Sequence, residues 1–567
     1  MLNNPVVYTE KSNCQNCYKC IKECFVKAIK IDNKKAIIDP LLCVNCGHCT
    51  VICPSGSNKA RNELDRVKDF VLLEEKIIVS LDTSYKAEFS KFSDNQIIAA
   101  IKSLGISDVS ETALGAEIVA DETINYINDN DEGVYFSSTC PSIVSLICKY
   151  YSEYKNNLIP LMSPMLSHGK MLKKMYGDNV KVVHIGPCIA KKMEADEYSQ
   201  YVDAVITYKD LSDWMDVEFV HFSDFEPNNE IEFIPEKSTI GNLFSIEGGI
   251  LSCMQKKADE NNISLMSFSG FEKVGLALKE LNLQELKGKI FVELSACDGS
   301  CINGPASKNQ ESSIIKKQSV LEAIDPNRRK QTFQNINIDK TFNILPVKNT
   351  IYSEDQITEV LESIGKFSNI DEYNCGACGY SNCKNFAKAI LDGKADRTMC
   401  VPYMKKVAFN QTSAILHKIP YGIILINNDL RVIEANINFA KILGEDIEIV
   451  FKNKPGLENA DLKKLLPCHS LFKSVLDSGE ELIEKNFEIS GKTIQISIVN
   501  IQKNKIICAI MRDMQLPHVT RELVVERARK VIDESRLTVQ NIAYLLGENA
   551  SHTEAMLNSI IESNQSL

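Results

Sequence analysis

Two cysteine-rich runs near the N-terminus have the residue types and spacing for iron–sulfur chemistry. Residues 14–24 read CQNCYKCIKEC and residues 43–54 read CVNCGHCTVICP, so both contain the pattern C-x2-C-x2-C-x3-C. Four cysteine thiolates hold a 4Fe–4S cubane, and this spacing is the bacterial one for such clusters. Zinc is the alternative, but zinc sites rarely place three cysteines two residues apart. The two runs therefore predict two 4Fe–4S clusters.

The fourth cysteine of each run is expected to bind the cluster of the other run. This is the arrangement in two-cluster ferredoxins, which the segment resembles. The resemblance implies a ferredoxin-like domain with two 4Fe–4S clusters over residues 1–60. Its ligands would be two sets of four cysteines: Cys14, Cys17, Cys20 and Cys53, and Cys24, Cys43, Cys46 and Cys49.

A further set of cysteines lies far downstream. Cys375, Cys378, Cys383 and Cys400 have the spacing C-x2-C-x4-C-x16-C. The intervening FAKAILDGKA has helical spacing, with Gly393 where a helix cap would fall, so helix and loop could return Cys400 to the other three. The pattern resembles the small 4Fe–4S domain of corrinoid iron–sulfur proteins and of membrane electron-transfer complexes. It implies a third accessory cluster in a small helical domain over residues 351–406, with a zinc ribbon as the alternative.

Four more cysteines each follow a short strand-like stretch. Cys140 comes after VYF, Cys188 after KVVHI, and both Cys297 and Cys301 after KIFVEL. Because α/β folds place functional loops at the ends of strands, four cysteines on three strand ends can converge on one cluster. The remaining cysteines have apolar surroundings and are expected in the core; they are Cys148, Cys253, Cys468 and Cys508.

The three loops that carry these four cysteines resemble the signature loops of the FeFe-hydrogenase catalytic domain. SSTCPS, IGPCIAKKMEA and ACDGSCINGP stand where that family reads approximately TSCCP, MPCxxKxxE and ACxGGCxxGGGQP. LMSPM and DAVITYKDL also have family counterparts, and the likeness extends over residues 76–350. It implies an α/β catalytic domain that holds an H-cluster, which is a 4Fe–4S cluster joined to a diiron unit with CO, cyanide and an azadithiolate bridge.

The same resemblance implies roles for individual residues. The cubane would be held by Cys140, Cys188, Cys297 and Cys301, and Cys301 would bridge it to the diiron unit. Lys191 matches the lysine that hydrogen-bonds a cyanide, and Glu194 matches the glutamate of the same loop. Glu122 stands where the family has a glutamate on the proton path.

Several positions around the implied diiron unit depart from the family pattern. Thr139 replaces a cysteine that relays protons, and a hydroxyl ionises far less readily than a thiol, so proton delivery should be slow. Other changed positions are Met165, His168, Gly186, Ser295 and the NGPAS of residues 303–307. His168 is either a substitute proton carrier or a structural histidine. A site that keeps its ligands but loses its relay is expected to sense rather than to turn over quickly.

Residues 407–516 have the pattern of a small sensory domain. A strand (GIILIN), a turn, a second strand (RVIEAN) and a helix follow in order, and KNFEIS, KTIQISIVNI and KIICAIMRD fit three closing antiparallel strands. This resembles a PAS domain of the α+β class, with Asp429, Asn436 and Phe439 at positions typical of that fold. An unrelated small α+β domain is the alternative. The sequence identifies no ligand for it.

Residues 517–567 are predicted to be a C-terminal helix. There is no proline between Arg521 and Ser563, and apolar residues recur mostly three or four apart. Such a stripe suits a parallel dimer seam or a docking helix for a partner, whereas packing against the preceding domain is the alternative. No kinase, cyclase or DNA-binding motif follows, so any output is expected to pass through a separate signalling protein.

Composition excludes several classes of protein. The 567 residues carry a formal net charge of −11, which argues against a nucleic-acid partner because such a protein needs a basic face. No apolar run reaches the about 18 residues of a membrane helix, and no signal peptide is evident. We therefore expect a cytoplasmic protein without a membrane partner. Its 20 cysteines are then expected to bind metal, since the cytosol keeps thiols reduced.

The whole chain is thus expected to be a multidomain α+β and α/β protein that resembles the sensory, PAS-bearing group of FeFe-hydrogenases. The resemblance implies slow, reversible reaction with dihydrogen and protons, an electron partner such as ferredoxin, and an anaerobic host. A homodimer through the PAS domain and the C-terminal helix would carry the signal. The alternatives are a catalytic ferredoxin-linked hydrogenase and a redox-regulatory iron–sulfur protein without a diiron unit.

Overall fold

The chain divides into two compact units, Met1–Met399 and Cys400–Leu567. The computed structural model describes residues 5–227, 231–325, 328, 336–348, 350–407, 418–514, 531–532 and 535–536. The expected C-terminal helix over residues 517–567 lies outside this description except for those last four residues. In the described parts of the chain, we find no helix that is both long and apolar enough to cross a membrane.

The N-terminal cysteine segment, residues 5–60, consists of two short antiparallel strand pairs and two short helices. Its elements are β1 (Val7–Thr9), α1 (Lys19–Glu23), β2 (Ile29–Asp32), β3 (Lys35–Ile38), α2 (His48–Ile52) and β4 (Asn58–Ala60). Strand β1 pairs with β4, and β2 pairs with β3, both antiparallel. The two helices begin alike, because Tyr18 and Gly47, at equivalent places in the two cysteine runs, both have left-handed backbone conformations.

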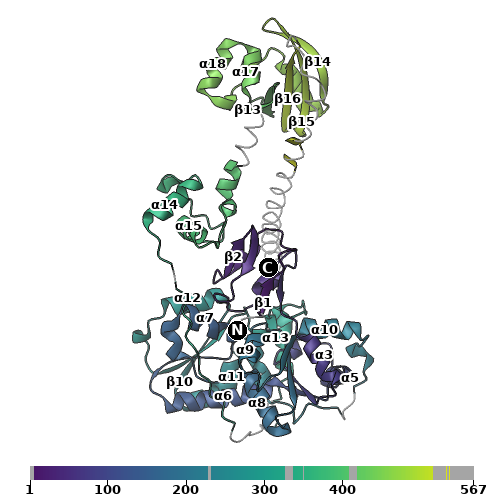
Figure 1. Ribbon diagram of the computed structural model, residues 1–567, viewed down its shortest axis with the longest axis vertical. Helices are drawn as coiled ribbons and strands as arrows, with labels where there is room; N and C mark the ends of the chain where they lie inside the picture. The colour runs from purple at the N-terminus through teal and green to yellow at the C-terminus, as the bar shows by residue number, and fades with distance from the viewer. Residues whose placement is uncertain are drawn as a thin grey trace, which may run out of the picture. The chain divides into compact units, whose positions relative to one another are not determined.

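Two parallel sheets form the centre of the first unit (Figure 1). The four-stranded sheet has the order β6-β5-β8-β9, and the three-stranded sheet has the order β10-β11-β7. Their strands are β5 (Ile77–Leu81), β6 (Asp108–Glu111), β7 (Gly133–Phe136), β8 (Lys181–Gly186), β9 (Ala204–Thr207), β10 (Ile263–Ser269) and β11 (Lys289–Ser295). Strand β5 is buried at every residue, as is usual where helices cover both faces of a parallel sheet.

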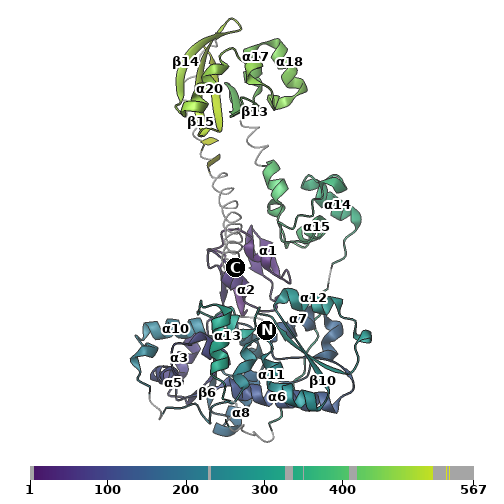
Figure 2. The same cartoon turned by 180° about the vertical axis from the view of Figure 1, so that it is seen from behind.

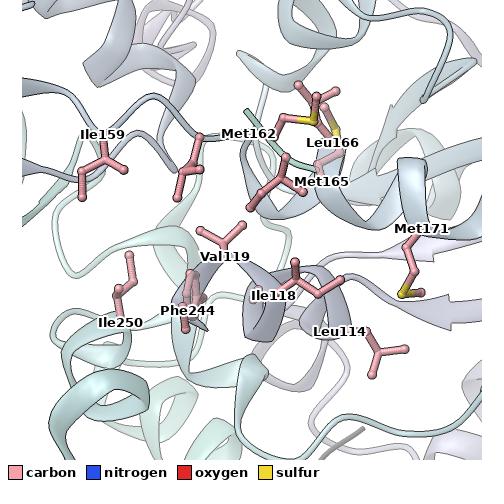
Figure 3. Close-up of a cluster of buried hydrophobic side chains, with 14 of the residues drawn as sticks. Leu114, Ile118, Val119, Ile159, Met162, Met165, Leu166, Met171, Phe244 and Ile250 are labelled. Carbon is pink, nitrogen blue, oxygen red and sulfur yellow. The ribbon is translucent and has the colours of Figure 1, made fainter. Parts of the chain in front are cut away.

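Helices connect and cover these strands. They are α3 (Leu64–Leu72), α4 (Tyr85–Glu88), α5 (Asp94–Ser103), α6 (Thr112–Asp129), α7 (Pro141–Tyr150), α8 (Pro164–Tyr176), α9 (Lys191–Glu197), α10 (Tyr208–Val217), α11 (Gly249–Glu260), α12 (Phe271–Glu280) and α13 (Ser313–Glu322). Both views show α6 and α8 side by side (Figures 1 and 2). The side chains between them form an apolar cluster that includes Leu114, Ile118 and Met165 (Figure 3).

The small cysteine segment, residues 351–406, contains α14 (Glu354–Ser363) and α15 (Cys383–Leu391). Ser353 and Gln356 form a capping box at the start of α14, and the Asn382 side chain caps α15. Gly393, two residues beyond α15, has the positive φ of 69° that a helix C-terminus favours. The expected helix and its end are therefore confirmed. The boundary between the two units falls inside this segment, between Met399 and Cys400.

The second unit contains a five-stranded antiparallel sheet of order β13-β12-β16-β15-β14. Its strands are β12 (Gly422–Asn427), β13 (Val432–Ala435), β14 (Leu482–Ile489), β15 (Lys492–Gln502) and β16 (Ile506–Asp513), so all five expected strands are present. The helices are α17 (Ile437–Leu443), α18 (Glu445–Asn453), α19 (Leu462–Leu465) and α20 (His469–Ser478). Buried Asn436 caps α17 and also bonds the start of β12, while apolar side chains such as Phe439 and Phe472 form the core.

Candidate iron–sulfur centres and the site between the two sheets

In the N-terminal segment, Cys53 of the second run lies near thiols of the first run, and Cys24 of the first run lies near thiols of the second. Burial, with the neighbouring thiols of Cys17, Cys53 and Cys14, raises the pKa of Cys20 to about 11. In the other set, burial and the neighbouring thiols of Cys24 and Cys43 contribute to raising the pKa of Cys46 to about 12. Thiols that raise one another's pKa in this way are a donor set that a positively charged metal centre would stabilise.

The strand-end site, by which we mean Cys140, Cys188, Cys297 and Cys301, lies at the carboxyl ends of three strands from both parallel sheets. Cys140 follows β7, Cys188 follows β8, and the other two follow β11. Burial, and then the thiols of Cys301, Cys188 and Cys140, raise the pKa of Cys297 well above its usual value. The four sulfur atoms therefore converge, although they come from residues far apart in the chain.

The surroundings of these sulfur atoms suit a cubane. Backbone N–H groups of Ile143, Ala296 and Ser142 hydrogen-bond the sulfur of Cys140, and that of Lys191 hydrogen-bonds Cys188. Such hydrogen bonds to ligating sulfur tune iron–sulfur clusters. Among the described residues, no three Cys, His, Asp or Glu side chains converge on the position of a single ion. A cubane, with four irons, spaces its thiolates more widely than one ion does.

A buried ion pair lies beside the strand-end site. Asp82, directly after β5, pairs with Lys191 at the start of α9, and its Oδ2 lies 3.4 Å from Nε2 of His184. The other oxygen, Oδ1, accepts hydrogen bonds from the backbone N–H and the hydroxyl of Ser84, at 3.0 and 2.6 Å. Although burial opposes it, Lys191 and His184 hold the pKa of Asp82 well below its usual range. The carboxylate is therefore charged, and its charge is balanced within the protein.

Gly186 makes the position of Asp82 possible. A Cβ atom on Gly186 would lie 2.7 Å from Cβ of Asp82 and 3.0 Å from Nε2 of His184, closer than side-chain atoms approach one another. Any larger residue at this position would displace the carboxylate. The absence of a side chain at position 186 and the placement of the Asp82 carboxylate beside Lys191 therefore depend on each other.

The other residues expected at the site have diverse surroundings. Glu194 is buried and accepts hydrogen bonds from Lys340 at 2.7 Å and from Ser163 at 2.6 Å. Thr139 directly precedes Cys140 and is partly buried. Glu122 lies on α6 and is partly exposed, with Asn125 donating to it at 3.4 Å. In the described part of the chain, no hydrogen bond or ion pair connects Glu122 to the strand-end cysteines.

His168 has the surroundings of a structural histidine. It is fully buried, and its two ring nitrogens lie 2.7 Å from the Ser80 hydroxyl and 2.8 Å from the Ser110 hydroxyl. Burial, together with His184, lowers its pKa to about 3, so the ring is neutral. Met165, another changed position, is wholly inside the apolar cluster of α6 and α8 (Figure 3).

The small cysteine segment contacts the N-terminal cysteine segment. The backbone N–H of Ile31 donates to the Gly393 carbonyl at 2.9 Å, and the Lys27 ammonium lies 5.1 Å from the centre of the Tyr380 ring. Burial, and then the thiols of Cys378 and Cys24, raise the pKa of Tyr380. Cys375, Cys378 and Cys383 belong to the first unit and Cys400 to the second, so the structure describes the first three by themselves.

The structure adds residues that the sequence did not indicate, namely Asp82, His184, Lys340 and Glu293. Asp82 and His184 could have been suspected only as polar residues in or after apolar strands. Glu293 is buried in β11, and one of its oxygens has no hydrogen-bond partner among the residues that the structure describes. Burial raises its pKa to about 8, although backbone N–H groups at the start of α11 partly oppose this.

Two parts of the chain match known protein families. Residues 70–305 match the family described as iron only hydrogenase large subunit, C-terminal domain. The chain carries a hydrogenase-type domain. The matched residues of this hydrogenase-type domain include all four strand-end cysteines, Lys191 and Asp82. Residues 371–402 match a separate Fe–S cluster family, FeS, and this match includes Cys375, Cys378, Cys383 and Cys400.

Individual relatives of the chain are distant. It is 24% identical over 380 residues to iron hydrogenase 1 of Clostridium pasteurianum, and 23% identical over 349 residues to the NADP-reducing hydrogenase subunit HndD of Solidesulfovibrio fructosivorans. The matches cover 55% and 50% of this chain, and the chain spans 66% and 59% of the length of these relatives. A variant of the [FeFe]-hydrogenase HydA1 of Chlamydomonas reinhardtii is similar over 48% of this chain and 91% of its own, with 15% identity and a TM-score of 0.39.

Proposed function

We propose that the chain is a sensory FeFe-hydrogenase that reacts slowly and reversibly with dihydrogen and passes the resulting redox change to a PAS-type domain. The observation that carries this proposal is the composition of the strand-end site. Its four cysteines converge beside Lys191, as the family pattern requires, yet the relay cysteine is Thr139 and the lysine is already paired with Asp82. The ligands are retained while the surroundings of the reacting centre have changed.

The strand-end residues fit an H-cluster in their donor types. Cys140, Cys188, Cys297 and Cys301 would hold the cubane, and Cys301 would also hold the diiron unit beside Lys191. When bound, the diiron unit supplies the metal centre where dihydrogen is split or formed. Cys301 is partly buried, and burial is the largest cause of its raised pKa. Lys191 stays protonated there, because the Asp82 carboxylate raises its pKa against the effect of burial.

The contact between the N-terminal cysteine segment and the strand-end site supports electron transfer between them. A Cβ atom on Gly47 would lie 2.5 Å from Cδ1 of Ile189, so the loop after Cys46 packs directly on the loop of Cys188. The Cys140 thiol also contributes to the raised pKa of Cys46. Two 4Fe–4S clusters in the N-terminal segment would thus link the strand-end site to a soluble electron carrier such as ferredoxin.

A signalling role for the second unit is supported by its fold. When its five strands are numbered in chain order, their order in the sheet is 2-1-5-4-3, which is typical of PAS domains. The Asn436 side chain that caps α17 is also typical of that fold. The third cluster, on Cys375, Cys378, Cys383 and Cys400, would connect this unit to the N-terminal clusters. A cytoplasmic homodimer and a separate signalling protein would complete the pathway, and the ligand of the PAS-type domain is left unassigned.

An infrared spectrum of the anaerobically matured protein tests the proposal. We expect bands from metal-bound CO and cyanide that shift when dihydrogen is added. In Cys301→Ala the bands should be absent, whereas Cys468→Ala in the second unit should retain them. A matured protein that contains all its cubanes but shows no such bands would contradict the proposal.

A redox-regulatory iron–sulfur protein without a diiron unit is the second candidate. The Asp82–Lys191 pair favours it, because a lysine whose charge is already balanced attracts an anionic diiron unit less strongly. The two candidates differ in iron content. A diiron unit adds two irons without acid-labile sulfide, so equal amounts of iron and sulfide in matured protein would favour the second candidate.

A further inference from the structure

We propose that the small cysteine segment exchanges electrons with one particular N-terminal cluster through a junction around Lys27, and that the charge of Lys27 raises the reduction potentials of the clusters on both sides. The proposal rests on the electron path of the proposed function, but it needs no diiron unit. The partner is the cluster of the Cys24 set, by which we mean Cys24, Cys43, Cys46 and Cys49. The other N-terminal set, called the Cys14 set, consists of Cys14, Cys17, Cys20 and Cys53.

Close backbone packing holds the two segments together at this junction. A Cβ atom on Gly379 would lie 2.6 Å from Cα of Lys22 and 2.9 Å from its carbonyl oxygen, so a larger residue would collide with the backbone there. Gly379 directly follows Cys378, and Lys22 lies on α1, two residues before Cys24. A second contact is the backbone hydrogen bond between β2 and the loop that follows α15. The loop of one expected ligand therefore lies against the helix that leads to another.

Lys27 contacts both segments. Backbone N–H groups of Lys27 and Ala28 hydrogen-bond the sulfur of Cys24, and the nitrogen of Ala28 lies 3.3 Å from that sulfur. The Lys27 ammonium donates to two carbonyls of α1 and lies 5.1 Å from the centre of the Tyr380 ring. Tyr380 comes two residues after Cys378. The ammonium is thus held between a ligand of the Cys24 set and the loop of Cys378.

The charge of Lys27 acts on ligands of both segments. Burial lowers the pKa of Lys27, and the thiols of Cys24 and Cys378 oppose this effect. The carboxylate of Glu23 acts on Lys27 less strongly than either thiol does. Net charge and solvent exposure near an iron–sulfur cluster set its reduction potential. A partly buried cation between two thiolate sets therefore stabilises an added electron on either side.

The Cys14 set has a negative group at the corresponding place. Burial, and then the Asp396 carboxylate and the Cys14 thiol, raise the pKa of Tyr18 to about 12. An anion from the small cysteine segment disfavours an added electron on the cluster beside it, whereas the Lys27 cation favours one. The Cys24 set also lies beside the strand-end site. It is therefore the branch point from which electrons reach the strand-end site and the small cysteine segment.

The step at this junction moves one electron. A reduced one-electron carrier of the ferredoxin type supplies the electron to the Cys24 set. The cluster there is then oxidised by one electron as the third cluster is reduced by one. No bond forms or breaks and no proton moves, since Lys27 keeps its proton before and after the step.

The first experiment measures reduction potentials. The full chain, loaded anaerobically with its 4Fe–4S clusters but with no diiron unit, is titrated and followed by electron paramagnetic resonance. Each potential is assigned by its loss in a ligand variant: Cys43→Ala for the Cys24 set, Cys375→Ala for the third cluster and Cys14→Ala for the Cys14 set. In Lys27→Met, the first two clusters should bind an electron about tenfold more weakly, which is about 59 mV for a one-electron couple. The potential of the Cys14 set should stay unchanged.

Lys11→Met is the matched control. Lys11 lies three residues before Cys14, as Lys27 lies three residues after Cys24, but it is exposed and pairs with Asp32 at 3.1 Å. Since solvent and Asp32 balance the charge of Lys11, its removal should leave all the potentials unchanged. Lys27→Arg keeps the charge and should keep both potentials near those of the wild type. Potentials that do not change in Lys27→Met, or that change equally at every cluster, would overturn the role of Lys27.

The second experiment measures the rate across the junction. Cluster-loaded protein is mixed with less than one equivalent of reduced ferredoxin and frozen at intervals, and reduction of the third cluster is followed by electron paramagnetic resonance. Gly379→Ala drives a Cβ atom into the backbone of Lys22 and should slow this reduction about tenfold. Gly376→Ala is its control, because Gly376 has a similar positive φ, 70° against 82°, but a Cβ atom there meets nothing within 4 Å. An unchanged rate in Gly379→Ala, with iron and sulfide contents retained, would overturn the junction.

Infrared spectra of the matured protein separate this proposal from the proposed function. Absent CO and cyanide bands, together with potentials that fall in Lys27→Met, would overturn the proposed function and leave the junction standing. Bands that shift under dihydrogen, together with potentials that ignore Lys27, would overturn the junction and leave the proposed function standing. Shifting bands and lowered potentials would support the two together.

Discussion

The N-terminal cysteine segment and the strand-end site both gather cysteines, but they do so by different means. In the N-terminal segment, three cysteines of each set come from one short run, residues 14–20 or 43–49, and each run ends in a cysteine for the other set. In the strand-end site, Cys140, Cys188 and Cys301 come from loops that follow strands of two different sheets. One arrangement depends on local turns and the other on the tertiary fold.

The ion pairs near the two regions also differ, because one is exposed and the other is buried. The pair between His48 and Glu23, in the N-terminal segment, is about half exposed. The pair between Asp82 and Lys191, beside the strand-end site, is almost fully buried. Solvent screens the first pair, whereas the second has only protein groups to balance it. The comparison teaches that the charge balance beside the strand-end site depends on protein groups alone, whereas that of the His48–Glu23 pair is shared with solvent.

The largest expected difference between the two regions is the effect of losing one cysteine ligand. Cys301→Ala should abolish the reaction with dihydrogen and the infrared bands, because Cys301 would hold both parts of the H-cluster. Cys14→Ala should remove one accessory cluster and leave those bands in place, since its set is separate. Iron, sulfide and infrared measurements on the two variants would check this. Loss of the bands in both variants would break the comparison.

The next-largest expected effect is the loss of stability when one partner of an ion pair is removed. Asp82→Ala leaves Lys191 buried without its carboxylate and should destabilise the protein by about 3–5 kcal/mol. Glu23→Gln, at the exposed pair, should change stability by less than about 1 kcal/mol. Urea unfolding of the cluster-free protein, followed by circular dichroism, measures both. Equal effects would show that burial does not distinguish the two regions.

Substitutions at Gly186 and Asp82 should have effects on stability that depend on each other. Gly186→Ala brings a Cβ atom to 2.7 Å from Cβ of Asp82 and should destabilise the protein by about 1–3 kcal/mol. In Asp82→Ala the new methyl group still meets the Cβ atom but displaces no carboxylate, so the two changes should be non-additive by about 1 kcal/mol. A double-mutant cycle from urea unfolding gives this coupling. Additive effects would contradict the assignment of Gly186 as the residue that makes room for Asp82.

The last expected effect is a pH dependence at Glu293, which builds up gradually over several pH units. Its folded pKa, about 8, is above that of an unfolded glutamate, so the folded state binds the extra proton between these values. Its contribution to stability is present below about pH 4 and is lost as the pH rises toward 8, by at most about 1.4 kcal/mol per pH unit. Glu293→Gln should flatten the stability profile over that range. An unchanged slope would show that folding does not raise the pKa of this carboxyl.

The sequence predicted the elements that depend on local pattern. The spacing of the N-terminal runs, the strands before Cys140, Cys188 and Cys297, and the five strands of the second unit all follow from neighbouring residues. The Asp82–Lys191 pair could not be predicted, because it joins the end of β5 to the start of α9 across a chain separation that no periodicity encodes. Likewise, Glu194 contacts Lys340, which only the tertiary fold brings near.

The position of the strand-end cysteines on two sheets has a consequence for biogenesis. The N-terminal runs are complete once residue 54 has left the ribosome, so their clusters can be inserted while synthesis continues. Cys140, Cys188 and Cys301 meet only after β11 has joined its sheet, and by then their sulfur atoms are becoming enclosed. A cluster at this site would therefore be inserted only after synthesis of the third loop, whereas clusters of the N-terminal runs could be inserted earlier.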